Sequence, residues 1–129
     1  MNKNEILKAL CSLGFMPEEV EGFGYSIDYE NLTIYIPVDE EDADSKCLTL
    51  LAPGIFVITK ENRQAVLEAM VKLCCCFKYV QPVLMFDDQV GINYQHFLGD
   101  NEVSETILEH MINVVAFATV KFHNILNED

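Results

Sequence analysis

Alternation of apolar and polar residues with a period of two predicts strands in the first half of the chain. Between residues 23 and 29, aromatic and aliphatic side chains alternate with glycine, serine and aspartate. The same pattern resumes at Leu32 and continues to Ile36. Glu30 and Asn31 separate the two runs, so we predict a β-hairpin that turns at these two residues.

Three later segments predict further strands. The segment from Cys47 to Thr59 is rich in leucine, isoleucine, valine and threonine. Pro53-Gly54 interrupts it, and because proline cannot donate to a β-ladder, we expect a bulge, an edge or a tight turn there. Residues 80–86 and 90–98 predict a second hairpin, which turns between them.

Apolar residues spaced three and four apart predict three helices. The first covers residues 4–13 and is followed by Gly14, a residue type common just beyond a helix C-terminus. The second covers residues 61–77. The third begins after Ser104, whose hydroxyl suits the N-cap position, and continues to about Leu126.

The predicted element order is helix, three strands, helix, two strands, helix. Short turns between neighbouring strands favour antiparallel pairing, so the predicted class is α+β, with a five-stranded antiparallel sheet and three helices. No repeat or linker divides the 129 residues. We therefore expect residues 1–129 to form a single domain.

Two predicted strands are apolar on both faces. Ile55 and Val57 point to one side while Phe56 and Ile58 point to the other, and residues 80–86 behave in the same way. Five strands make a sheet roughly 24 Å wide, and three helices, each about 10–12 Å across, can cover one face of it. A second copy of the chain, or an apolar client segment, is therefore predicted to cover part of the other face. The alternative is that helices lie on both faces.

Three large rings are the candidate contacts for such a partner. They are Tyr35, Phe56 and Phe97, each of which belongs to a predicted strand. We expect them on the face opposite the helices, and placement in the core is the alternative for each.

Charge narrows the classes of partner. The chain has 21 acidic and 8 basic residues, which give a net charge of −13 at pH 7. Phosphate backbones and anionic membrane surfaces would repel it, whereas a basic or apolar partner would suit it. Charged residues interrupt the start of the chain, and no stretch approaches the roughly 20 apolar residues of a membrane span. Neither a secretory signal nor a membrane helix is predicted.

The five cysteines do not fit a disulfide framework, because their number is odd and three of them are consecutive. We expect reduced thiols and a cytoplasmic protein. Neighbouring helical residues diverge by about 100°, so Cys74, Cys75 and Cys76 would not converge on one metal ion. Cys74 is expected to face the core as a small apolar side chain.

No motif predicts catalysis, a cofactor or a metal. The acidic segment from Val38 to Lys46 fails the calcium-loop pattern, since Lys46 and Pro53 stand where ligand oxygens are required. The three histidines are scattered and match no ligand motif. The chain is therefore predicted not to be an enzyme, and the acidic segment to be a solvated loop that could dock a basic client segment.

The element order, the segment lengths and the acidity resemble the type III secretion chaperone-like fold, which includes the Tir chaperone (CesT) and YbjN families. The segment Val66-Leu67-Glu68-Ala69-Met70-Val71-Lys72-Leu73 is similar to the central helix of these families. A hairpin of the expected size follows, and Glu102-Val103-Ser104-Glu105 leads into the closing helix. The acidic loop and the cysteine triplet have no counterpart in that pattern.

The resemblance implies a homodimer that binds protein. Likeness to the secretion chaperones implies that apolar patches hold an extended client segment. Likeness to YbjN implies instead a sensory or stress regulator that binds a folded partner. A third reading, a small-molecule binder or enzyme, would need a concave pocket with convergent polar groups, and the sequence names none.

Overall fold

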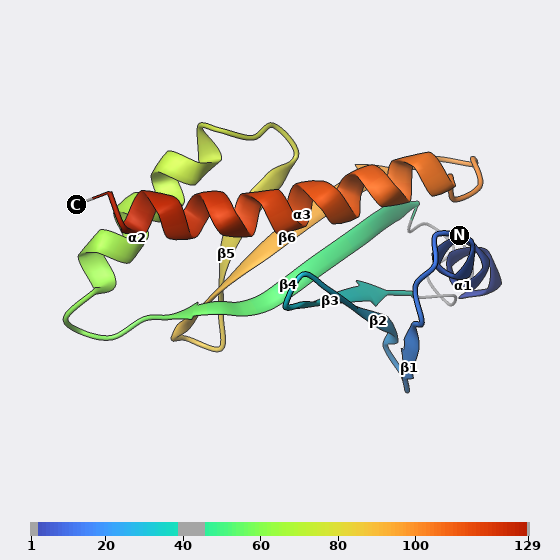
Figure 1. Ribbon diagram of the computed structural model, residues 1–129, viewed down its shortest axis with the longest axis horizontal. Helices are drawn as coiled ribbons and strands as arrows, with labels where there is room; N and C mark the ends of the chain where they lie inside the picture. The colour runs from blue at the N-terminus through green and yellow to red at the C-terminus, as the bar shows by residue number, and fades with distance from the viewer. Residues whose placement is uncertain (1–2, 39–45, 129) are drawn as a thin grey trace.

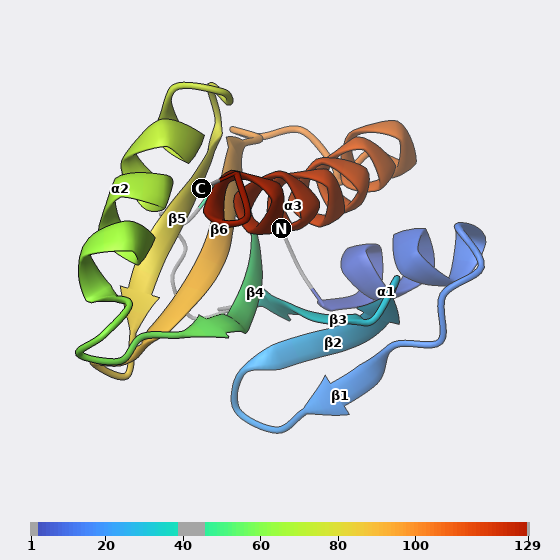
Figure 2. The same ribbon diagram turned by 60° about the vertical axis from the view of Figure 1, so that its left-hand side comes forward.

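The computed structural model describes residues 3–38 and 46–128, in which three helices lie on one face of a six-stranded sheet (Figures 1 and 2). The elements in chain order are α1 (Lys3–Ser12), β1 (Glu18–Val20), β2 (Gly24–Tyr29), β3 (Leu32–Pro37), β4 (Cys47–Val57), α2 (Arg63–Cys74), β5 (Val80–Met85), β6 (Gln89–Phe97) and α3 (Glu105–Leu126).

The strand order is β1-β2-β3-β4-β6-β5, and every neighbouring pair is antiparallel. The predicted α+β class, the antiparallel sheet and the three helices are confirmed. The predicted number of strands is wrong, because β1 adds a sixth. This strand has only three residues, two of them glutamate, so it carries no alternating pattern, and backbone pairing with β2 defines it.

Turn residues explain the first hairpin. Glu30 and Asn31 join β2 to β3, and both have positive φ angles, 49° and 68°. Two consecutive positive φ angles are typical of the type I′ turn, whose twist matches that of the flanking strands. The predicted turn at these residues is confirmed.

A bulge in β4 bends the centre of the sheet. Ala52 pairs with Ile92 and Phe56 pairs with Val90, so four steps along β4 match two steps along β6. Of the alternatives predicted for Pro53-Gly54, the structure has the bulge. Extra residues in one strand increase the local twist, and Figure 1 shows β1, β2 and β3 turned away from the plane of β5 and β6.

The long helix α3 anchors the core on the covered face. The Ser104 hydroxyl caps it by accepting a hydrogen bond from the Ile107 backbone N–H at 3.4 Å. Its buried stripe faces the sheet and includes Phe122, which has no exposed surface. The helix packs against α2, and its other end contacts α1.

The end of α2 differs from the prediction. The helix ends at Cys74, three residues before the predicted end at 77, and Cys74, Cys75 and Cys76 are all exposed. The prediction that Cys74 faces the core is wrong, because Leu73 fills the core position at this end of the helix. All five cysteines are free thiols.

Register separates the two faces of the sheet. On the covered face, Leu50, Tyr94 and Val80 form one buried row across three strands. On the other face, which we call the open face, a row runs through paired residues of all six strands. In order, this row is Glu18, Ser26, Tyr35, Leu51, Asn93 and Gln81. All three helices lie on the covered face (Figure 2).

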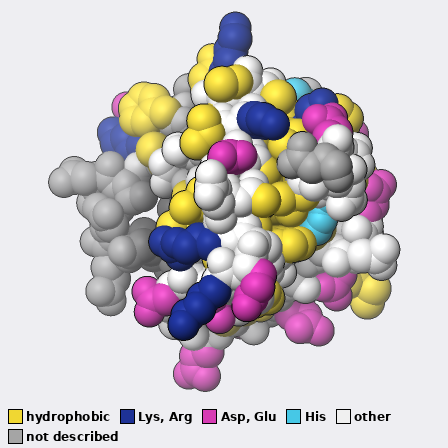
Figure 3. All heavy atoms as spheres, turned by 90° about the vertical axis from the view of Figure 1, so that its left-hand side faces the viewer, with side chains coloured by type: hydrophobic (Ala, Val, Ile, Leu, Met, Phe, Trp, Pro, Cys, Tyr) yellow, Lys and Arg dark blue, Asp and Glu magenta, His cyan; other side chains and the backbone are white. Residues whose placement is uncertain are grey.

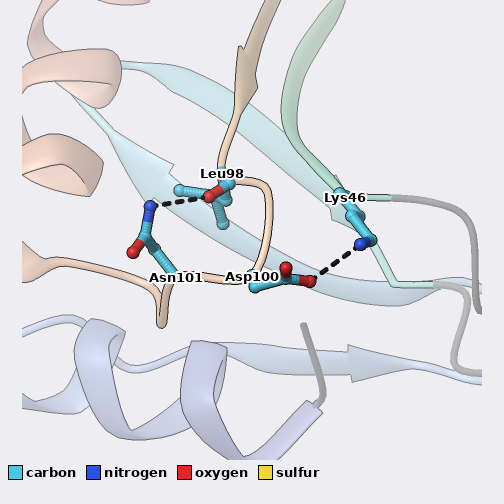
Figure 4. A network of polar contacts seen from close by, with 4 residues as sticks. All are labelled: Lys46, Leu98, Asp100 and Asn101. Carbon is cyan, nitrogen blue, oxygen red and sulfur yellow. Dashed lines mark hydrogen bonds and ion pairs between the residues drawn. The ribbon is translucent and has the colours of Figure 1, made fainter.

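Polar contacts tie the start of β4 to the end of β6 (Figure 4). The Lys46 ammonium lies 2.7 Å from a carboxylate oxygen of Asp100. The hydrogen bond from Lys46, and its positive charge, lower the pKa of the Asp100 carboxyl. The Asn101 side-chain amide donates to the Leu98 carbonyl at 3.0 Å. The acidic segment predicted to be a solvated loop falls mostly on residues 39–45, which lie outside the described residues.

Candidate functional site

The open face carries an apolar groove at its bulged end. The strands β1 and β5 lie at opposite edges of the sheet, yet residues of both line this groove, because the sheet curls around the β4 bulge. Its volume is about 450 Å³, in the usual range for sites that bind a ligand. The groove is lined by Val20, Phe23, Tyr35, Leu51, Pro53, Gly54, Met85, Phe86 and Gln89. We call these residues the open-face groove.

Phe86 is the least expected residue of the open-face groove. It lies in the β5–β6 turn with φ of 53°, a left-handed conformation that is unusual for an aromatic residue. Its ring is 75% exposed, so burial in the core does not offset the backbone strain. Strained residues that the core does not require are concentrated at functional sites. Phe86 is therefore a candidate contact.

Two hairpin turns form opposite walls of the open-face groove. The β1–β2 turn carries Phe23, which is 37% exposed and packs edge-on against Tyr35 with ring centroids 6.0 Å apart. The β5–β6 turn carries Phe86, and Met85 lies beside it over Gly91. Pro53 and Gly54 of the bulge line the groove between the walls. As a whole, the site combines residues from five separate strands and two turns.

The structure separates the three predicted contact residues. Tyr35 is half-buried and lines the open-face groove. Phe97 is 71% exposed and lies on the same face. Eight steps along β6 separate it from Gln89 in the groove, a distance of about 27 Å in an extended strand.

Phe56 lies on the covered face instead. Its ring packs edge-on against Phe122 and His123 of α3, with centroid distances of 6.2 Å to both. Ile58 is also buried. Of the residues expected to need an external cover at this point, Phe56 is therefore shielded by α3 and Ile58 is buried. The residues that face the open side are Leu51, Val57, Val83 and Met85.

Sequence reasoning missed most of the open-face groove. Phe23, Leu51 and the pair Met85-Phe86 come from three segments that only the strand order brings together. One signal was available in the sequence. The turn Phe86-Asp87-Asp88 has a phenylalanine where hairpin turns prefer glycine or asparagine.

Both edges of the sheet are poorly suited to receive an added strand. At one edge β1 is short and contains Glu18 and Glu19. At the other edge β5 contains Pro82, which lacks an N–H and pairs with Ile92 of β6. Short, charged and proline-containing edges discourage pairing with another chain. The faces are the better candidates for contact with a partner.

A second apolar surface lies on the outer side of α2, at the end of the molecule shown in Figure 3. Leu67 and Val71 lie four residues apart, and Val71 is 66% exposed. Arg63, Glu68 and Lys72 lie beside them along a shallow groove of about 730 Å³. We call these five residues the α2 surface. It combines an apolar stripe with side chains of both charges.

Potential metal-ligating side chains do not gather around a common point in the described residues. Among residues 3–38 and 46–128, no group of three or more His, Cys, Asp or Glu side chains is placed to hold a metal ion. Burial raises the pKa of the Tyr94 phenol, and the neighbouring Tyr79 adds to the effect. In that same part of the chain, no helix is long and apolar enough to cross a membrane.

Comparisons with known proteins identify the fold. No protein-family profile matches the sequence, and no curated protein matches it. Among solved structures, YbjN from E. coli, described as a candidate transcription regulator, superposes with a TM-score of 0.68 at 7% identity, over 92% of this chain and 87% of YbjN. An uncharacterized protein from Methanothermobacter thermautotrophicus also gives 0.68, at 14% identity, over 99% of this chain and 98% of that one.

The third similar structure is a secretion chaperone. The Yersinia pestis type III secretion chaperone SycH, solved in complex with a stable fragment of YscM2, superposes with a TM-score of 0.64 at 16% identity. The match covers 93% of this chain and 98% of SycH. The chain therefore has the fold shared by YbjN and this chaperone, as the sequence pattern predicted.

Proposed function

We propose that the chain is a single-domain, cytoplasmic protein-binding module that holds a client segment in the open-face groove and forms a homodimer. The open-face groove is the observation on which the proposal rests, because it is apolar, concave and lined by a strained, exposed phenylalanine. The likeness to a chaperone solved with a fragment of another protein supports it. The five free thiols support a reducing compartment.

Replacing Phe86 by asparagine separates binding from folding. Asparagine tolerates the left-handed conformation, so stability is expected to stay constant or rise by up to about 1 kcal/mol. Affinity for an apolar peptide is expected to fall about tenfold, since the peptide loses a large ring surface to bury. Fluorescence anisotropy with a labelled peptide of about ten residues, together with urea unfolding, measures both effects.

The matched control is Phe117→Asn. Phe117 is 62% exposed, comparable with Phe86, but it lies on α3 and packs against Phe77. This control is expected to leave peptide affinity unchanged, whereas Tyr35→Ser in the open-face groove should lower it. Unchanged affinity in both Phe86→Asn and Tyr35→Ser would exclude the groove as the client site.

Phe97 tests how far the client extends. If a segment lies along β6, about eight extended residues would reach from the open-face groove to this ring. Phe97→Ser is then expected to weaken only peptides longer than that. An equal effect on short and long peptides would show that the segment does not follow β6.

The α2 surface is our candidate for contact between two copies. Its apolar stripe is exposed, and the presence of both Arg63 and Glu68 allows complementary pairing across a two-fold axis. Val71→Asp is expected to convert a dimer into a monomer, as measured by light scattering coupled to gel filtration. Val120→Asp, at a valine 54% exposed on α3, is the matched control. A dimer that persists in Val71→Asp would place the interface elsewhere.

The likeness to YbjN favours a second candidate function. Its TM-score of 0.68 is at least as high as that of the secretion chaperone, so a regulator that binds a folded partner has equal support from the fold. Such a protein would not bind extended peptides through the open-face groove. The Phe86 and Tyr35 variants therefore distinguish the two functions.

A further inference from the structure

The described strands of the sheet carry no positive charge. None of the eight lysine and arginine residues falls within a described strand or in the turns that join β1 to β2, β2 to β3 and β5 to β6. Seven of the basic residues belong to the helices or to segments that flank them, and Lys46 directly precedes β4. The eight basic residues are Lys3, Lys8, Lys46, Lys60, Arg63, Lys72, Lys78 and Lys121.

Carboxylates border the open-face groove on both walls. On one wall, Glu18 lies on the open face, in the row that contains Tyr35, and Glu21 lies in the turn beside Phe23. On the other wall, Asp87 and Asp88 follow Phe86 directly. None of these four carboxylates forms an ion pair with another described residue. Each is exposed and available to a ligand.

We propose that the open-face groove selects a cationic amphipathic segment, whose apolar residues enter the groove while lysine or arginine residues on both sides meet the carboxylates of the two walls. This inference rests on the proposed function and adds the chemistry of the client. An apolar centre matches the lining of the groove, and flanking cations match walls that carry only negative charge. Such a segment would be attracted to the carboxylates of the sheet side, whereas the helices carry charges of both signs.

Two peptides that differ only in charge test the proposal. Each has about twelve residues, roughly 40 Å when extended, with the same apolar centre flanked by lysines in one and by glutamines in the other. The full chain is titrated with each peptide at about 0.01 M and about 1 M salt, where the screening length is about 30 Å and about 3 Å. The cationic peptide is expected to bind at least about tenfold more tightly at low salt, and this advantage should largely disappear at high salt.

Variants of the wall carboxylates test whether these groups cause the preference for the cationic peptide. Asp87→Asn/Asp88→Asn is expected to weaken the cationic peptide about three- to tenfold and to leave the neutral peptide unchanged. Glu102→Gln/Glu109→Gln removes the same charge from the helix side, at two exposed residues outside the groove and the α2 surface, and is the matched control. If Asp87→Asn/Asp88→Asn weakened binding of the cationic peptide no more than the control variant does, the proposal would be overturned.

The same two peptides distinguish a failure of charge selection from a failure of the proposed function. If both peptides bind with equal affinity, and Tyr35→Ser abolishes that binding, charge selection would be refuted. The open-face groove would still be supported as the client site. Absence of binding by either peptide would refute the client site and this inference with it. Tighter binding of the cationic peptide, reduced by the wall variant and by Tyr35→Ser, would confirm both.

Discussion

Replacing Phe122 by alanine is expected to lower the free energy of unfolding by about 3–5 kcal/mol. The Phe122 side chain has no exposed surface and packs edge-on against Phe56 of β4. Alanine would lose the buried ring area and leave a cavity between α3 and the sheet. Because small domains are stable by only about 5–15 kcal/mol, a loss of this size should be obvious in urea unfolding followed by circular dichroism.

Phe117→Ala on the same helix is the matched control. Phe117 is 62% exposed and contacts one ring, that of Phe77 at 5.9 Å, so its loss should cost less than about 1.5 kcal/mol. Equal losses in the two variants would contradict the packing described for α3.

The same packing connects the core to the proposed site. Phe122 supports Phe56, which follows the bulge, while Pro53 and Gly54 of the bulge line the open-face groove on the opposite side of the sheet. A cavity behind Phe56 would loosen the groove from the covered side. Phe122→Ala is therefore expected to weaken peptide binding although Phe122 does not line the groove.

Local pattern predicted the fold well because most elements carry their own signal. Alternation identified β2, β3 and β6, and the spacing of apolar residues identified three helices. The strand β1 was missed because three residues are too few to show a period, and its two glutamates disfavour a strand. Its existence depends on the backbone of β2, which no local pattern reports.

The face to which a residue belongs is harder to predict where both faces are apolar. In the run Ile55-Phe56-Val57-Ile58, alternation divides the residues into two sets but does not say which set the helices cover. Contact with Phe122, 66 positions later in the chain, decides it. Tyr35 carries no such ambiguity, since its neighbours Ile34 and Ile36 are both buried.

The open-face groove depends on strand order in the same way. Phe23 and Phe86 are 63 positions apart in the chain and line one groove because β4 is bulged and the sheet curls. The absence of lysine and arginine from the described strands can be read from the sequence once the strands are assigned. Its meaning requires the knowledge that all three helices lie on the face opposite the groove.

Replacing Gly24 by alanine is expected to lower the free energy of unfolding by about 2–4 kcal/mol. Gly24 opens β2 with φ of 155°, a value that residues with a side chain rarely adopt. A methyl group there would overlap the Ile36 carbonyl oxygen and lie 2.9 Å from the Val38 nitrogen. Both are backbone atoms of the paired strand or its end, so relief requires β2 and β3 to separate locally, and urea unfolding measures the cost.

Gly22→Ala isolates the contribution of the close approach. Gly22 lies in the β1–β2 turn with φ of 75°, and an added methyl group there would meet nothing within 4 Å. Only backbone strain remains, which is expected to cost about 1 kcal/mol. If Gly24→Ala were no more destabilising than Gly22→Ala, the tight contact between the start of β2 and the end of β3 would be refuted. Phe23 lies between the two glycines, so Gly24→Ala should also displace one wall of the open-face groove and weaken peptide binding more than Gly22→Ala does.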